Sequence, residues 1–385
     1  MMNRIYLDHA ATTPVSESVL SEMMPFFRSC WGNASAVYAT GREARKAIEK
    51  ARKQVAEAIG AEPREILFTG GGSESDNLAL KGTAFALQEK GKHIITSAIE
   101  HPAVLNTCRW LEKHGFEVTY IMPESTGLID PAKVRTCIRD DTILISMMAA
   151  NNEIGTLEPV AEVGAIAKER NILFHTDAVQ AVGAVPVNVQ EWNADLLSIS
   201  AHKFYGPKGT GALYVRRGTR IDSLIHGGEQ ERGLRAGTEN VPAIVGLGKA
   251  IENANRDLDI TAAQTALLRD RLISGIMKEI PGARLNGTIA GRLPNNCNIS
   301  FEGIDGEALL LRLDLAGIAA SSGSACTAGN QEVSHVLKAI GLTEDEAKGS
   351  LRLTTGTGNT EKEMDEAVHA ISEIVKDLRT LFHGR

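Results

Sequence analysis

The chain has 385 residues and a net charge of −7, with 41 basic and 48 acidic side chains. This length predicts two domains, or one large domain with a smaller one. No basic stripe is present, which argues against direct nucleic-acid binding. Five cysteines without a CxxC pair argue against a disulfide framework and a structural metal site, and they fit a reducing compartment. Because no apolar stretch has the length of a membrane span or the pattern of a signal peptide, we expect no membrane partner and a cytoplasmic location.

Short apolar runs alternate with helical patterns, which is typical of an α/β domain with a mainly parallel sheet. We expect helices at 75–87, 102–114 and 159–170, and a helical stretch at about 245–280 that contains a domain boundary. Residues 15–256 would form the large domain, and 1–14 with 257–385 a smaller α+β domain. Ligands of such sheets bind at the carboxyl ends of the strands. Seven strands are expected, at 66–68, 93–96, 118–121, 143–146, 172–175, 196–199 and 211–215.

A glycine-rich turn, Thr69 to Ser75, follows the first of these strands. Glycines allow a close approach of backbone to an anion, and the following helix supplies free N–H groups, so the turn has the form of a phosphate cradle. It has neither the P-loop nor the dinucleotide-binding spacing. The alternative is a tight strand-to-helix turn with Ser73 as the N-cap.

Three further strand ends carry polar side chains that suit chemistry. His101 precedes a helix, where a capping histidine is the alternative, and Asp177 ends a strand with Gln180 shortly after it, where a capping acid is the alternative. Lys203 leaves an apolar strand into a Gly/Pro loop, so it could be desolvated enough to form a Schiff base. A lysine that reaches the surface is the alternative there.

These side chains together match the needs of pyridoxal phosphate. That cofactor requires an imine-forming amine, an acid beside its ring nitrogen, a planar group over the ring and an anion site. Cys326 lies in a run of small, polar and glycine residues at 321–329, which favours a mobile loop that could carry a thiol to a reaction. Cofactor and thiol together predict sulfur chemistry.

Eight segments, in order along nearly the whole chain, resemble those of cysteine desulfurases, in the NifS/IscS-like group of the class V aminotransferase superfamily. The resemblance implies a fold-type-I pyridoxal phosphate enzyme: a large domain with a mainly parallel seven-stranded sheet flanked by helices, plus a smaller α+β domain. It also implies a homodimer. The segments are 6–14, 32–35, 69–77, 100–104, 151–155, 177–180, 200–209 and 321–327.

The implied reaction is a sulfur transfer from L-cysteine that leaves L-alanine. Cys326, on a loop at about 321–333, would take the sulfur as a persulfide, pass it to an IscU/NifU-like scaffold or another acceptor for iron–sulfur cluster assembly or thiolation, and could ligate a transient iron–sulfur cluster. No other metal is expected. Val333 stands where relatives commonly have proline, which could change the exit from the loop and the choice of acceptor.

The resemblance also implies a role for each matching residue. At the cofactor ring, Lys203 would form the imine, Asp177 would contact the ring nitrogen and Gln180 the ring hydroxyl. His101 would stack on the ring and transfer protons, and Asn152 would contact the ring or its hydroxyl. The phosphate would be bound by Gly72, Ser73, Ser200, His202 and, across the dimer, Thr238. Arg352 would bind the substrate carboxylate, with Asn33 as a helper. Alternatives are a selenocysteine lyase or an aminotransferase on the same fold, or a scaffold-bound sulfur carrier with low activity alone.

Overall fold

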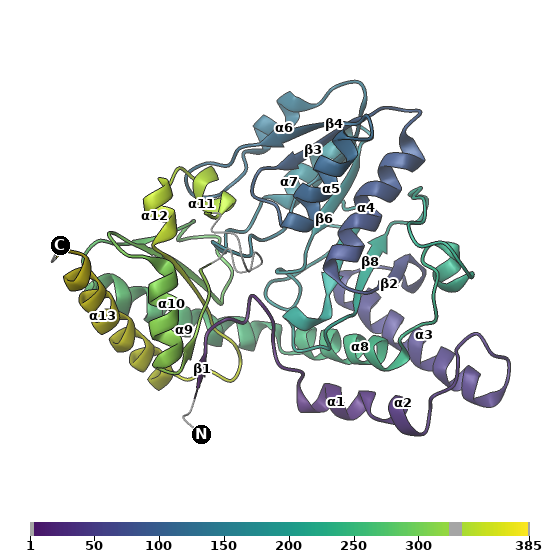
Figure 1. The fold of residues 1–385 in the computed structure, drawn as a ribbon. Coiled ribbons are helices and arrows are strands. Elements are labelled where there is room, and N and C mark those ends of the chain that lie inside the picture. Colours follow the sequence, from purple (N-terminus) through teal and green to yellow (C-terminus); the bar gives the residue numbers. More distant parts are fainter. Residues whose placement is uncertain (1–3, 323–332, 384–385) are drawn as a thin grey trace.

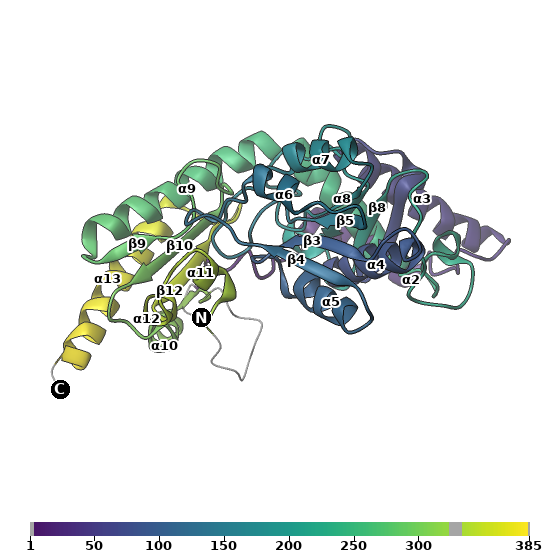
Figure 2. The ribbon, with the colours of Figure 1, turned by 90° about the horizontal axis from the view of Figure 1, so that it is seen from above.

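The computed structural model describes residues 4–322 and 333–383, which form two α/β bodies side by side. The larger body contains α1 to α8, and the smaller one contains α9 to α13 (Figure 1). Figure 2 shows the same two bodies from above, with α8 in the larger body and α9 in the smaller one. No helix of the described residues is both long and apolar enough to cross a lipid bilayer.

The larger body is built on a seven-stranded sheet in the order β2-β8-β7-β6-β5-β3-β4. Six strands run in one direction, and β8 alone is antiparallel to both of its neighbours. All seven expected strands are present, each within two residues of its predicted ends. Their bounds are β2 Ile66–Thr69, β3 His93–Ser97, β4 Glu117–Ile121, β5 Thr142–Ser146, β6 Leu173–Asp177, β7 Leu196–Ser200 and β8 Gly211–Val215.

Helices cover both faces of this sheet, because alternate side chains of its strands are apolar on each face. Ile66 and Phe68 pack on one side with α3, α6, α7 and α8, whereas Leu67 packs on the other with α4 and α5. The bounds of the helices in this body are α1 Glu17–Met23, α2 Pro25–Arg28, α3 Ala39–Ile59, α4 Gly72–Leu87, α5 Pro102–Glu112, α6 Pro131–Cys137, α7 Val160–Glu169 and α8 Val241–Arg256, with 3-10 turns η1 Pro63–Glu65, η2 Ala201–Lys203 and η3 Gln230–Gly233.

The smaller body has its own apolar core around the antiparallel sheet β12-β10-β9. The amino-terminal strand β1 pairs in parallel with β11, which brings residues 5–6 to this body. Its elements are β1 Ile5–Tyr6, α9 Leu258–Glu279, β9 Ala283–Leu285, β10 Asn296–Phe301, α10 Gly306–Leu315, β11 Ile318–Ala319, α11 His335–Ala339, α12 Glu344–Lys348, β12 Ser350–Thr354 and α13 Glu361–His383.

The helical stretch expected at about 245–280 is two helices, because the backbone leaves the helical region at Asp257 (φ −100°, ψ 10°). Helix α8 packs against α3 and α1, whereas α9 packs against α13. We therefore propose the division into 15–256 and 1–14 with 257–385, supported by this break and by the two apolar cores.

Candidate active site

Lys203 lies where the carboxyl edge of the large sheet meets the amino-terminal segment. Strand β7 ends at Ser200, one residue later than expected, and Lys203 closes the 3-10 turn Ala201–Lys203 that follows it. Its Nζ donates hydrogen bonds to the carbonyl oxygens of Ala10 (2.6 Å) and Ala11 (2.9 Å). Gln180 Nε2 donates to the same Ala10 oxygen at 3.0 Å. The structure therefore brings Lys203 and Gln180 together at one carbonyl oxygen.

Asp177 and His101 lie near this lysine, at the ends of β6 and β3. Burial raises the pKa of Asp177, while the charges of His101 and Lys203 oppose that rise. Burial lowers the pKa of His101, so its imidazole is neutral near pH 7. Its Nδ1 accepts from the backbone N–H of Ala103 (3.1 Å), which leaves the ring hydrogen on Nε2. His101 is thus the N-cap of α5 and also a neighbour of Asp177.

Asp177 fits a partner for a cationic ring nitrogen. Its Oδ1 accepts from the backbone N–H of Val179 (2.9 Å), although no helix follows, because residues 179–184 form turns. A cation bound against this buried carboxyl would favour its ionised form, in the way that Lys203 already does.

The glycine-rich turn lines an open hollow of about 430 Å³ between α4, η2 and the amino-terminal segment. A Cβ atom on Gly72 would lie 2.8 Å from Val179 Cγ2, so only glycine leaves the space open. Ser73, Ser200 and His202 line the hollow. Burial lowers the pKa of His202 to about 4, so its ring is a neutral hydrogen-bonding group. These groups fit a phosphate.

Helix α4 starts earlier than expected, at Gly72, and this corrects the alternative that made Ser73 the N-cap. Gly71 is the N-cap, with φ 146°, and no side chain caps the helix. Glycine reaches that backbone conformation without strain. The first N–H groups of α4 therefore face a hollow that an anion can enter.

Arg352 lies on β12 at the other side of the site, where it is buried at 3% exposure. Its Nη1 donates to the carbonyl oxygen of Asn152 (2.9 Å), and its Nη2 to Asp8 Oδ1 (2.9 Å). Its Nε has no hydrogen-bond partner among the described residues. Asp8 was not singled out from the sequence, because its partner lies 344 residues further along the chain.

Cys326 lies outside the described residues, and the residues that flank the range 323–332 lie near Arg352 and Glu153. Before the segment, the Arg352 N–H donates to the Ser321 carbonyl oxygen at 2.6 Å. After it, Ser334 Oγ donates to Glu153 Oε2, next to Asn152 in the chain. Val333 contributes to a small apolar cluster with Ile99 and Val336.

Asn33 and Thr238 lie in a different place from Arg352. Both line a hollow of about 260 Å³ between the loop after α2 and the segment before α8. Thr238 also lines a smaller hollow with Gly70 of its own chain. The single chain therefore does not bring Asn33 or Thr238 to the hollow that Ser73 and Ser200 line.

Buried polar groups that the sequence analysis missed lie beneath the sheet edge. Asp76 and Glu100 are almost wholly buried, and burial raises the pKa of both, that of Glu100 to about 8. His175 hydrogen-bonds Ser146 (2.8 Å) and Ser198 (3.0 Å), and burial lowers its pKa to about 3. No local sequence pattern marks these residues, because their burial depends on neighbours that are distant in the sequence.

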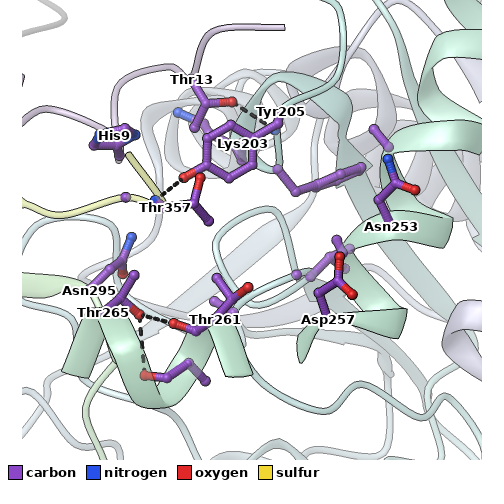
Figure 3. A pocket seen from close by; sticks show the side chains of 18 of the residues that line it. His9, Thr13, Lys203, Tyr205, Asn253, Asp257, Thr261, Thr265, Asn295 and Thr357 are labelled. Carbon is purple, nitrogen blue, oxygen red and sulfur yellow. Dashed lines mark hydrogen bonds between the residues drawn. The ribbon is translucent and has the colours of Figure 1, made fainter. Parts of the chain in front are cut away.

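A second cavity, of about 360 Å³, lies behind Lys203 at the junction of the two bodies. Figure 3 shows Thr13 and Tyr205 on one side of it and Thr265 on the other. Tyr205 has a left-handed backbone (φ 65°), and its hydroxyl accepts from the Thr357 N–H at 2.8 Å. This contact joins the loop after η2 to the smaller body.

Comparison with known proteins shows what this chain is similar to. The family described as Aminotransferase class-V matches residues 5–366. Proteins named cysteine desulfurase IscS are 55% identical in Methanosarcina thermophila, covering 98% of this chain and 93% of the relative, and 53% identical in Dictyoglomus turgidum, covering 99% and 97%. A solved NifS-like protein is 41% identical with a TM-score of 0.92, covering 97% of this chain and all of that one. SspA in complex with cysteine is also 41% identical, with a TM-score of 0.82, and covers 93% of this chain and 100% of its own.

Proposed function

Because the chain belongs to the aminotransferase class-V family, we propose that it is a pyridoxal phosphate-dependent cysteine desulfurase that converts L-cysteine to L-alanine. Relatives at more than half identity over nearly the whole chain carry that name. The structural observation that supports it most is the meeting of a lysine, a buried acid and an open glycine cradle at one sheet edge, with the anchors of the Cys326 segment beside Arg352.

The residues at the sheet edge would hold the cofactor. Its phosphate would lie in the cradle of Gly72, Ser73, Ser200 and His202, with Asp177 at the ring nitrogen. Gln180 and Asn152 would contact the ring hydroxyl or ring, and His101 would stack on the ring. Bound there, pyridoxal phosphate supplies an aldehyde that reacts with amines and a ring that draws electrons from the substrate Cα.

Proton movement falls to Lys203 and His101. The lysine amine removes the proton from the substrate Cα. Its hydrogen bond to the Ala10 carbonyl oxygen (2.6 Å) holds it at the junction of the two bodies. His101, neutral and with its hydrogen on Nε2, would act in proton transfer as a hydrogen-bond donor. Arg352 binds the substrate carboxylate with its planar guanidinium, and Asn33 assists.

Cys326 takes the sulfur. Its thiolate attacks the substrate sulfur, so an S–S bond forms on Cys326 while the carbon–sulfur bond breaks with its electrons left on carbon. A proton then adds to that carbon, and alanine leaves. Cys326 is five residues beyond Ser321, and five residues of chain reach at most about 18 Å. Ser321 itself lies beside Arg352, because its carbonyl oxygen accepts from the Arg352 N–H.

The oligomeric state, the sulfur acceptor and the location are part of the same proposal. We propose a homodimer in which Thr238 contacts the phosphate of the partner subunit, since Thr238 and Asn33 share a hollow away from Arg352. An IscU/NifU-like scaffold or another acceptor would receive the sulfur, and the location would be the cytoplasm.

Borohydride reduction of the cofactor-loaded protein, followed by peptide mass spectrometry, tests the assignment of Lys203. Reduction should attach the cofactor to the peptide that contains Lys203. Lys203→Ala should lose this label and the release of alanine from L-cysteine. The matched control is Lys168→Ala, at an exposed site where Lys168 Nζ donates to Asn193 Oδ1 (2.9 Å). It should keep both the label and the release of alanine. A label on another lysine, or alanine release by Lys203→Ala, would contradict the proposal.

A further inference from the structure

An acidic side chain lies in the cradle that we propose for the phosphate. Glu74, in the first turn of α4, is the only acid among the described residues that line this hollow. Its Oε2 accepts from the backbone N–H of Gly70 at 2.8 Å. This contact ties down the glycine turn, but a carboxylate so close to an anion site would repel a phosphate dianion unless its charge were balanced.

Arg235 supplies that balance from a distant part of the sequence. Its Nε donates to Glu74 Oε1 (2.9 Å) and its Nη2 to Glu74 Oε2 (3.3 Å), so the two planar groups meet by two bonds. Both side chains are about one quarter exposed, which reduces screening by water. The hydrogen bond to Glu74 raises the pKa of Arg235.

Arg235 is held in place by a second, buried ion pair. Arg52 donates to both carboxylate oxygens of Glu231 (2.8 and 2.9 Å), and Glu231 also accepts from the Phe68 N–H at 3.0 Å. Glu231 and Arg232 have left-handed backbones, with φ of 45° and 59°. Such a conformation is uncommon outside glycine and persists only where surrounding contacts maintain it. The segment before Arg235 is therefore fixed against β2, which leads into the cradle.

We propose that Arg235 is a positioning residue for the phosphate cradle: it cancels the charge of Glu74 and holds this carboxylate as the acceptor for the Gly70 N–H. This rests on the proposed function, because it assumes that a phosphate monoester lies in the cradle. The expected ligand group is a phosphate dianion. Arg235 acts on it through Glu74.

The test compares the binding of pyridoxal 5′-phosphate with that of pyridoxal, which has no phosphate, by equilibrium dialysis. Arg235→Gln should weaken the binding of the phosphate form about tenfold, the size of one partly buried charge pair, and leave the binding of pyridoxal within about twofold. Glu74→Gln should change either affinity by no more than about threefold, because the glutamine oxygen can still accept from Gly70.

The double variant Arg235→Gln/Glu74→Gln gives the sharpest result. It should bind pyridoxal 5′-phosphate more tightly than Arg235→Gln alone, because the uncompensated charge is gone. The matched control is Arg271→Gln, which breaks an exposed pair with Asp365 in the smaller body and should bind as wild type does. A double variant as weak as Arg235→Gln, or an equal loss for pyridoxal, would overturn the inference. A wild type that binds neither compound would instead overturn the proposed function.

Discussion

Glu100 should make the protein less stable as the pH rises, and Glu100→Gln should remove that effect. The carboxyl is wholly buried, and burial raises its pKa from 4.5 to about 8. Its Oε1 accepts from Ser97 Oγ (2.6 Å) and from the Met148 N–H (2.9 Å). Its Oε2 has no hydrogen-bond partner among the described residues. A glutamine of the same shape can keep the two bonds to Oε1 without requiring a proton.

The direction of the pH dependence follows from the number of protons bound by the folded and the unfolded protein. Between pH 4.5 and about 8 the folded protein holds a proton on Glu100 that the unfolded chain has released. The free energy of unfolding then falls by up to about 1.4 kcal/mol for each pH unit. This stability is fully present below pH 4.5 and is lost as the pH rises to about 8. The total is on the order of 3 to 5 kcal/mol for a buried carboxyl with hydrogen bonds.

The assay is urea unfolding of the cofactor-free protein at pH 5, 7 and 9, at one protein concentration. Glu100→Gln should match the wild type within about 1 kcal/mol at pH 5 and be more stable by about 3 to 5 kcal/mol at pH 9. Glu89→Gln, at an exposed position just after α4, should stay within about 0.5 kcal/mol at each pH. A constant difference between Glu100→Gln and wild type at all three pH values would refute the argument.

Three further substitutions test other contacts. Gly356→Ala should destabilise the protein by about 1 to 3 kcal/mol in urea unfolding, because the new Cβ would lie 2.3 Å from His9 Cε1. The control is Gly358→Ala, whose Cβ would have no atom within 4 Å. Equal losses of stability in the two variants would count against the clash. Glu231→Gln should lower the free energy of unfolding by about 3 to 5 kcal/mol, because Arg52 then loses its buried charged partner. In contrast, Glu49→Gln, at the exposed end of the same cluster, should cost less than about 1 kcal/mol. Asp177→Asn should slow alanine formation by the loaded enzyme at least about a hundredfold, and a rate near wild type would remove Asp177 from the ring nitrogen.

The sequence was most informative where one local rule decides the structure. Apolar runs marked all seven strands of the large sheet, because strands buried on both faces have few polar positions. A lysine, an acid and a histidine near strand ends indicated the candidate site, because ligands of such sheets bind at the carboxyl ends of the strands. The sequence placed a domain boundary between residues 256 and 257 but predicted one helical stretch there, whereas the structure has two helices that meet at Asp257.

Contacts between distant residues could not be predicted in this way. The pairs Asp8 with Arg352 and Glu74 with Arg235 join residues 344 and 161 positions apart. A single charged residue in a sequence does not name its partner, since most are solvated. β8 runs antiparallel to β2 and β7, and residues 201–210, which join β7 to β8, are too few for the crossover that parallel strands need. The alternative that made Ser73 the N-cap of α4 is wrong: it relied on serine being a common N-cap, whereas the N-cap is Gly71.

The sulfur-carrying role of Cys326 is tested most directly by measuring alanine and sulfide formed from L-cysteine in the presence of a reductant. Wild type and Cys137→Ser, a partly exposed cysteine at the end of α6, should form both products in equal amounts over many turnovers. Cys326→Ser, loaded with the same cofactor, should form neither. Equal release of alanine and sulfide by Cys326→Ser would contradict sulfur transfer through this thiol.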